Sequence, residues 1–216
     1  MQDLFDLPGE AQAGTESLAE GALVLHGFAV KQATALLAAI AKVGAVAPFR
    51  RMVTPGGYEM SVAMTNCGTA GWVTDRKGYR YARLDPESGK PWPALPPPLL
   101  ALADAAAAMA GYVGFVPDAC LVNRYEPGAR LSLHQDRDEA DYRHPIVSVS
   151  LGLPATFQFG GLKRSDPVKK VPLRHGDVVV WGGPSRLVHH GVLTLKDGEH
   201  PATGRCRFNL TMRKAL

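Results

Sequence analysis

The stretch from residue 146 to residue 181, IVSVSLGLPATFQFGGLKRSDPVKKVPLRHGDVVVW, decides the fold class of this chain. It holds three short runs rich in β-branched and aromatic residues, at 146–151, 156–159 and 178–181. Turn-forming residues separate the runs, among them Gly160-Gly161 and His175-Gly176-Asp177. Short strands that follow one another without helices between them indicate antiparallel pairing, because parallel strands need long crossover connections.

Two further runs of the same kind flank this stretch, at residues 120–125 and 206–212. Five short strands favour a closed or double-sheeted architecture, and we predict a double-stranded β-helix, the jelly roll. Apolar residues at helical spacing predict a helix over 31–46 and an Ala-rich helix over 99–110. A short apolar run at 21–25 suits one more strand. The predicted fold is therefore mainly β with N-terminal helices.

Length and composition indicate one folded domain. The chain has 216 residues, of which 46% are apolar and 20% charged, as in ordinary globular proteins. Its apolar stretches fall short of the roughly 18 residues that a membrane span requires. Three cysteines without a C-x-x-C pair fit structural thiols in a reducing compartment. We expect a cytoplasmic monomer that makes no contact with membranes.

Charge is divided unevenly along the chain. The whole chain carries +4 and residues 1–20 carry −5, so residues 21–216 carry +9. We interpret residues 1–20 as a flexible acidic tail and residues 21–216 as a single domain. A basic body favours a polyanionic partner such as nucleic acid, because neutralised phosphates release counterions. A solvated lysine surface is the alternative interpretation.

A loop-rich segment lies between the two predicted helices, at about residues 50–98. Glycines punctuate it and five prolines close it, so it is predicted to hold mostly loops and short hairpins. Long irregular segments inside compact domains are usually functional. Trp72 lies here among Arg76, Lys77 and Arg80. Aromatic rings among cations suit a stacked base and its phosphates, and ordinary packing is the alternative.

A candidate metal site follows the strand predicted at 120–125. Residues 132–138 read SLHQDRD, so His134 and Asp136 lie two apart and point the same way in an extended chain. His190 would join them from a later strand. Two imidazoles and one carboxylate on one octahedral face leave open positions, the arrangement of non-haem Fe(II) oxygenases. The alternative is a surface histidine beside a solvated acid, which arises often by chance.

Polar and apolar residues alternate along 207–213, and the polar face carries Arg207 and Arg213. Two arginines facing a core require an anion, because an unpaired buried charge is costly. Beside the metal face, the natural guest is a dicarboxylic keto acid that binds the metal at one end and an arginine at the other. Asn123 and Tyr125 supply an amide and a phenol nearby. Alternatively, this face is the solvent side of an edge strand.

Seven runs of residues carry a family resemblance: PDACLVNRYEPGA at 117–129, LSLHQD at 131–136, MVTPGGY at 52–58, SVAMTNCG at 61–68, KPWP at 90–93, GGLKR at 160–164 and GDVVVWGG at 176–183. Together they resemble the AlkB family of Fe(II)- and 2-oxoglutarate-dependent nucleic-acid demethylases, over most of residues 20–213. The resemblance implies a jelly-roll core at 117–214 and a nucleotide-recognition lid at about 50–98, within one catalytic domain.

The resemblance also implies the chemistry. Iron would be held by His134, Asp136 and His190, with 2-oxoglutarate and O₂ as co-substrates. The implied reaction is oxidative dealkylation of N-alkylated bases, such as 1-methyladenine and 3-methylcytosine, which releases succinate, CO₂ and an aldehyde. The implied partners are alkylated single- or double-stranded DNA, and RNA.

Two further sets of residues are implied by the resemblance. The residues expected to hold 2-oxoglutarate are Asn123, Arg124, Tyr125, Arg207, Asn209 and Arg213. The residues expected to contact nucleic acid are Trp72, Tyr79, Arg80, Tyr81, Asp138 and Arg164. Within the second set, Trp72 would stack on a flipped base against His134, and Asp138 would face the base edge. Tyr79, Arg80 and Tyr81 would hold the strand backbone.

Three other functions compete with this interpretation. A related oxygenase of a protein side chain or small molecule would not need the aromatic lid or the basic body. A non-catalytic nucleic-acid binder would not need His134, Asp136 and His190 together. A zinc or manganese hydrolase could use those three residues but gives no role to Arg207 and Arg213.

Overall fold

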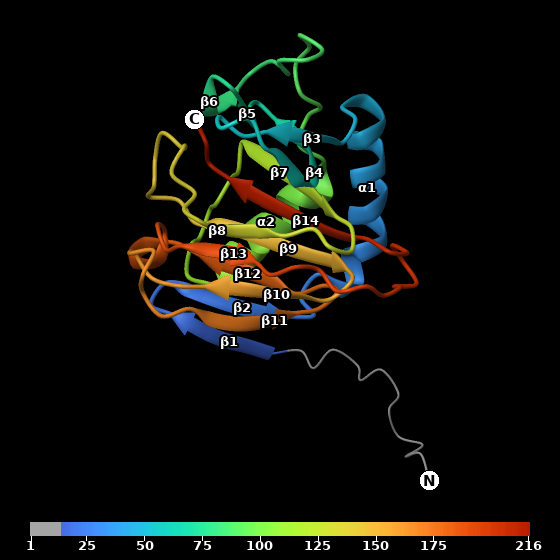
Figure 1. The fold of residues 1–216 in the computed structure, drawn as a ribbon. Coiled ribbons are helices and arrows are strands. Elements are labelled where there is room, and N and C mark those ends of the chain that lie inside the picture. The colour runs from blue at the N-terminus through green and yellow to red at the C-terminus, as the bar shows by residue number, and fades with distance from the viewer. Residues whose placement is uncertain (1–13) are drawn as a thin grey trace.

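The computed structural model describes residues 14–216 as two antiparallel sheets with a separate hairpin beside them (Figure 1). The larger sheet has eight strands in the order β1-β2-β12-β9-β14-β7-β4-β3. In that order they are β1 (Gly14–Ala19), β2 (Ala22–His26), β12 (Val178–Trp181), β9 (Ile146–Gly152), β14 (Arg207–Arg213), β7 (Ala119–Tyr125), β4 (Glu59–Gly68) and β3 (Arg50–Val53).

The smaller sheet has four strands, β11 (Lys169–Leu173), β10 (Ala155–Phe159), β13 (His190–Val192) and β8 (Leu131–His134). The hairpin consists of β5 (Gly71–Asp75) and β6 (Gly78–Ala82). The facing antiparallel sheets confirm the predicted jelly roll.

Two helices, α1 (Ala33–Val46) and α2 (Pro97–Met109), pack against the outer face of the larger sheet (Figure 1). Single 3-10 turns precede α1 at Val30–Gln32 and follow β12 at Gly183–Ser185. Both helices lie within two residues of their predicted bounds. Proline at the first position of α2 is compatible with helix geometry because that residue needs no backbone donor. None of the described helices is long and apolar enough to cross a membrane.

The alternating strands divide the interior into two apolar cores. Leu210 and Met212 of β14 face the helices, together with Val147 and Val149 of β9. A second core lies between the sheets and contains Trp181 and residues of both sheets. The polar residues of β14 face this second, inter-sheet side, so the fold directs them into the space between the sheets.

The flexible-tail prediction is wrong for residues 14–19, which form β1; residues 1–13 lie outside the described part of the chain. β1 pairs with β2 through a tight turn in which Gly21 has a φ of +73°. A Cβ on Gly21 would come within 2.6 Å of the Gly182 carbonyl oxygen, so a side chain does not fit there. Glu16 also pairs with Lys169 at 2.8 Å. The sequence GTESLA lacks the apolar alternation that would have indicated a strand.

The prediction of mostly loops at 50–98 is also wrong in part. β4 is ten residues long and pairs with β7 and β3 in the larger sheet. Its residues 62–67 are buried on both faces, so their sequence shows no alternation between apolar and polar positions. Short hairpins were predicted in this segment, and one is present as β5 and β6.

Candidate active site

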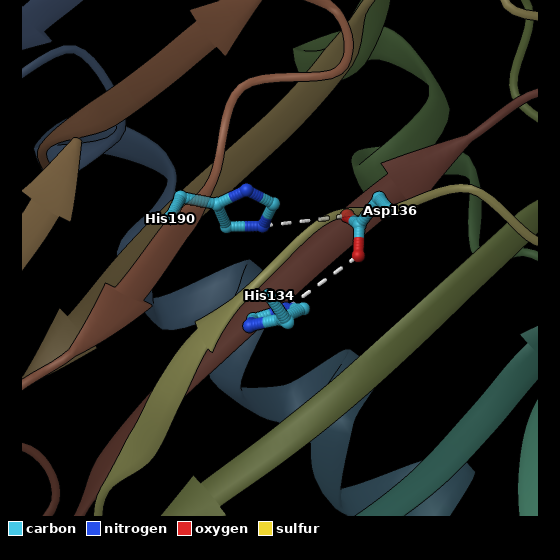
Figure 2. Close-up of side chains that lie close together, drawn as sticks. All are labelled: His134, Asp136 and His190. Atoms are coloured by element: carbon cyan, nitrogen blue, oxygen red, sulfur yellow. Dashed lines mark ion pairs between the residues drawn. The ribbon is translucent and has the colours of Figure 1, made fainter. Parts of the chain in front are cut away.

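The three predicted metal ligands lie together at one end of strands β8 and β13 of the smaller sheet (Figure 2). His134 ends β8 and His190 begins β13, and the two are direct partners in the strand register. Their ring centroids lie 4.4 Å apart. Asp136 follows two residues after His134, and its two carboxylate oxygens lie 3.6 Å from the Nε2 atoms of His134 and His190. One ligand atom from each residue lies within 4.8 Å of the others.

Backbone carbonyls orient both imidazoles. Nδ1 of His134 lies 2.8 Å from the Ser132 carbonyl oxygen, and Nδ1 of His190 lies 3.1 Å from the Val188 carbonyl oxygen. A proton on each Nδ1 would leave each Nε2 unprotonated and directed at the common centre, as metal-binding histidines require. Burial, and then the neighbouring His190, lower the pKa of His134 to about 4. This histidine is therefore neutral and able to bind a metal at physiological pH.

Arg213 fixes the carboxylate ligand. Its Nε donates to Oδ2 of Asp136 at 2.9 Å, and its Nη2 donates to the same oxygen. Burial raises the pKa of Asp136, but Arg213 and the two histidines outweigh it and hold the pKa well below its usual range. The carboxylate is therefore ionised. Two imidazoles and one carboxylate on one side of a centre fit Fe(II) with positions left open for other ligands.

Arg207 provides the test for 2-oxoglutarate. The residue is 1% exposed and its guanidinium lies over the Tyr125 ring, 4.9 Å from the centroid. Nη2 donates to the Ser150 hydroxyl at 2.9 Å, but Nε and Nη1 are buried with no hydrogen-bond partner among the described residues. Two orphaned donors on a buried cation fit a carboxylate, because leaving them unpaired is costly. The residues present therefore fit a dicarboxylic keto acid.

The surrounding strands place the other predicted 2-oxoglutarate residues with one exception. Asn123, Tyr125 and Asn209 line the same pocket as Arg207. The prediction for Arg124 is wrong: it points to the opposite face of β7, where its guanidinium lies 5.0 Å from the Phe49 ring centroid. Strand alternation is the reason, because neighbours of Asn123 and Tyr125 must face the other way. β14 lies between β9 and β7, so its polar face is not the solvent side of an edge strand.

A pocket of about 840 Å³ connects these groups to the surface. The metal ligands and Arg207 lie in its lining together with Trp72, Tyr79, Asp138 and Arg164. The aromatic rings of Trp181 and Phe157 lie beside His190, with centroids at 4.9 and 6.0 Å. The pocket therefore has an apolar wall at the metal ligands.

The hairpin places Trp72 at this pocket. The Trp72 and Tyr79 rings are stacked, with centroids 5.7 Å apart and an interplanar angle of 19°. The Trp72 indole N–H donates to the Asp138 carboxylate at 2.8 Å. Trp72 is half-buried and also packs against the inter-sheet core. The ring is therefore held at a defined position in the pocket wall.

The other two hairpin residues lie away from the pocket lining. Arg80 forms an ion pair with Asp75 at 2.8 Å on the opposite face of the hairpin, and its side chain is 34% exposed. That side-chain hydrogen bond is the main cause that lowers the pKa of Asp75 to about 2. The Tyr81 hydroxyl donates to Oε1 of Glu139 at 2.8 Å. The Tyr81 hydroxyl is therefore engaged within the protein and does not suit the expected contact with a nucleic-acid backbone. Arg80 keeps a partly exposed guanidinium, and its contact with nucleic acid stays a prediction.

Two buried charged residues of the site were not predicted. Arg186 and Glu139 form an ion pair at 3.1 Å, and their side chains are 3% and 2% exposed. Arg186 also donates to the backbone carbonyls of Asp136 and His144, at 2.8 and 3.1 Å. It therefore fixes the loop that carries the metal-binding carboxylate. The sequence shows Glu139 only as one of several acids after His134, and nothing in it indicates burial.

Comparisons with known proteins agree with this geometry. Residues 21–213 match the family described as the 2OG-Fe(II) oxygenase superfamily. The chain is 60% identical over 212 residues to the alpha-ketoglutarate-dependent dioxygenase AlkB of Escherichia coli (strain K12), covering 98% of both chains. It is 36% identical over 132 residues to the nucleic acid dioxygenase ALKBH1 of Mus musculus, covering 59% of this chain and 33% of that one.

A solved structure is similar as well. The structure of OsALKBH1 superposes with a TM-score of 0.83 at 28% identity, covering 93% of this chain and all of that one. The His–Asp–His cluster, the unpaired donors of Arg207 within the described residues and 60% identity to AlkB over nearly the full chain all point to Fe(II) and 2-oxoglutarate. This chain therefore belongs to the 2OG-Fe(II) oxygenase superfamily, as an alpha-ketoglutarate-dependent dioxygenase of the bacterial AlkB type.

Proposed function

We propose that this enzyme removes N-alkyl groups from damaged bases in DNA and RNA, with 1-methyladenine and 3-methylcytosine as substrates. The observation that carries the proposal is the placement of Trp72, a planar ring in the wall of the pocket that also holds the three metal ligands. A base taken out of its stack fits between aromatic or apolar side chains. The name of the mouse relative, a nucleic acid dioxygenase, supports the same substrate class.

Fe(II) held by His134, Asp136 and His190, with 2-oxoglutarate held at Arg207, would supply the oxidation by O₂. One oxygen atom would enter succinate as CO₂ is lost, and the other would enter the C–H bond of the N-methyl group. The resulting N-hydroxymethyl group then breaks its C–N bond to release formaldehyde and the repaired base. The protein binds and orients the reactants and keeps water out, because the cofactor carries the chemistry.

The site residues divide this work. Arg207 and the groups around it would hold the distal carboxylate of 2-oxoglutarate, and Arg213 would keep Asp136 charged and in position. Trp72 and His134 would hold the base between them. Asp138 lies in the pocket lining at the Trp72 indole, where its carboxylate can accept a hydrogen bond from an exocyclic amine of the base.

The rim of the pocket supports a polyanionic substrate. Arg130, Arg137 and Arg164 are exposed and line the pocket. Within residues 14–216 none of the three forms an ion pair with an acidic side chain. Arg164 donates one hydrogen bond to the Leu133 carbonyl at 2.6 Å and keeps its other donors. Guanidiniums without an acidic partner around a base-binding pocket suit the phosphates on either side of a flipped nucleotide. We further propose a monomer that acts on single and double strands in the cytoplasm.

Anaerobic reconstitution tests the proposal. The enzyme is loaded with Fe(II) and 2-oxoglutarate, an N-methylated oligonucleotide is added, and O₂ is then admitted while succinate and formaldehyde are measured. We expect formaldehyde in proportion to methyl groups lost, and only with the methylated strand. Parallel arms with DNA and RNA, single- and double-stranded, define the substrate. Turnover with a peptide or small molecule and none with any methylated strand would assign the enzyme to the competing class of hydroxylases.

A further inference from the structure

The loop at 135–145 joins the metal site to the β5–β6 hairpin. Three acidic residues in this loop are each held by a different element. Asp136 accepts from Arg213 of β14, Asp138 accepts from Trp72 of β5, and Glu139 accepts from Tyr81 of β6. The loop therefore touches both strands of the hairpin and supplies one of the metal ligands.

Glu139 is the central residue of a continuous buried chain of contacts. Its Oε1 accepts from the Tyr81 hydroxyl at 2.8 Å and lies 3.3 Å from Nε of Arg213. Arg213 in turn binds the carboxylate of Asp136. On its other side Glu139 pairs with Arg186, which holds the Asp136 carbonyl. Both paths from Glu139 end at Asp136, one at its side chain and one at its backbone.

The charges of the buried side chains connected to Glu139 balance. Arg186 and Arg213 carry two positive charges, and Asp136 and Glu139 carry two negative charges, all with side chains at most 10% exposed. Buried ion pairs tolerate little displacement, because breaking one leaves an uncompensated charge. A shift of Glu139 would therefore redistribute the hydrogen bonds that Arg213 gives to Asp136.

Tyr81 connects this chain to the base-binding ring. Tyr81 and Trp72 are direct partners in the β5–β6 register, so their side chains lie on one face of the hairpin. Burial raises the pKa of Tyr81 well above its usual value, so the phenol keeps its proton and acts as a donor. A bound base that displaces Trp72 would therefore also displace Tyr81 across the β5–β6 hairpin, and with it the hydrogen bond from Tyr81 to Glu139.

We infer that Tyr81 and Glu139 are positioning residues that couple occupation of the base pocket to the orientation of Asp136. This inference rests on the proposed function, since it says that these two residues limit oxidation to the enzyme with a base bound in the pocket. Neither residue touches the base or the reacting atoms. Their role is to make the arrangement of the metal-binding carboxylate depend on the position of the hairpin.

Tyr81→Phe tests the coupling, because it removes one hydroxyl and leaves the ring. Loss of one hydrogen bond to a charged group corresponds to roughly tenfold. We therefore expect succinate formed per formaldehyde released to rise by about threefold to tenfold with a methylated single-stranded DNA oligonucleotide. The Kd for 2-oxoglutarate should stay within about twofold of wild type. Tyr112→Phe is the matched control, because it removes a phenol that donates to the Gly21 carbonyl at 2.9 Å, outside the pocket lining.

Hydrogen–deuterium exchange gives a readout independent of turnover. In the anaerobic wild-type enzyme with Fe(II) and 2-oxoglutarate, the methylated oligonucleotide should protect both residues 71–82 and residues 135–145. In Tyr81→Phe the hairpin should remain protected while the loop from residue 139 onward loses its protection, because Asp138 keeps its own hydrogen bond to Trp72. Wild-type loop protection and a wild-type product ratio in this variant would overturn the inference.

Glu139→Gln adds a second variant that keeps an acceptor for Tyr81 but removes the charge. It should raise the product ratio at least as much as Tyr81→Phe, because Arg213 then pairs with Asp136 alone. If Glu139→Gln does not fold, Tyr81→Phe decides the matter. Absence of formaldehyde from the wild-type enzyme would contradict the proposed function. Formaldehyde from wild type together with an unchanged ratio in both variants would contradict only the inference.

Discussion

At the scale of single residues, substitution of Arg207 should change the affinity for 2-oxoglutarate without changing the stability of the free protein. Its Nε and Nη1 are buried and have no hydrogen-bond partner within residues 14–216, so the free protein gains little from its charge. We expect Arg207→Met, which keeps length and removes the charge, to leave the Tm of the free protein near that of wild type. The variant should lose roughly 2 to 5 kcal/mol of 2-oxoglutarate affinity, as for truncation of one partner of a buried pair. Anaerobic calorimetry measures the Kd, and an unchanged value would show that Arg207 does not bind the keto acid.

The three metal ligands should differ in the same comparison. His134→Ala, Asp136→Ala and His190→Ala should each abolish turnover, because each removes one of three ligands. Only Asp136→Ala should also strongly destabilise the metal-free fold, by about 3 to 5 kcal/mol, because it removes a carboxylate paired with buried Arg213. Urea unfolding of the metal-free variants tests this order. Equal losses of stability in all three would show that the Asp136–Arg213 pair adds nothing to the fold.

At the scale of elements, the β5–β6 hairpin presents an aromatic ring to the pocket. Trp72→Ala should weaken binding of a methylated oligonucleotide by roughly 1 to 3 kcal/mol, the value of one base stacked on an aromatic ring. Iron binding and 2-oxoglutarate affinity should remain as in wild type, because Trp72 touches neither group of residues. Fluorescence anisotropy measures the oligonucleotide affinity, and thermal unfolding measures the Tm of the variant. A large fall in Tm with unchanged oligonucleotide affinity would make Trp72 a packing residue.

The elements also show what the sequence could predict. The strands that became β9, β10 and β12 were found because apolar runs end at turn residues, and β14 because its polar and apolar residues alternate. β4 was missed because it is buried on both faces, and β1 because it is an edge strand with a polar sequence. In the site, the resemblance gave Arg124 a role that its position on the outer face of β7 excludes. Glu139 could not be found, because its burial depends on Arg186, which lies far away in the sequence.

At the scale of the whole molecule, the positive charge of residues 21–216 should appear in the salt dependence of binding. Each phosphate neutralised on a single strand contributes about 0.7 to the slope of log affinity against log salt concentration. If the three rim arginines at positions 130, 137 and 164 each meet one phosphate, the slope should be about −2 for a methylated single strand. The predicted slope should not change with pH, because the three arginines remain charged at all relevant pH values.

Single substitutions then show which positive charges contact the phosphates. Arg164→Ala should reduce the magnitude of the slope by about 0.7 and weaken all sequences equally, because a phosphate contact carries no base information. Lys42→Ala removes the same charge from the exposed face of α1, away from the pocket, and should leave the slope unchanged. Anisotropy titrations from low to high salt measure both. If Lys42→Ala reduces the slope as much as Arg164→Ala, the affinity comes from the net charge of the molecule and the rim arginines have no special role.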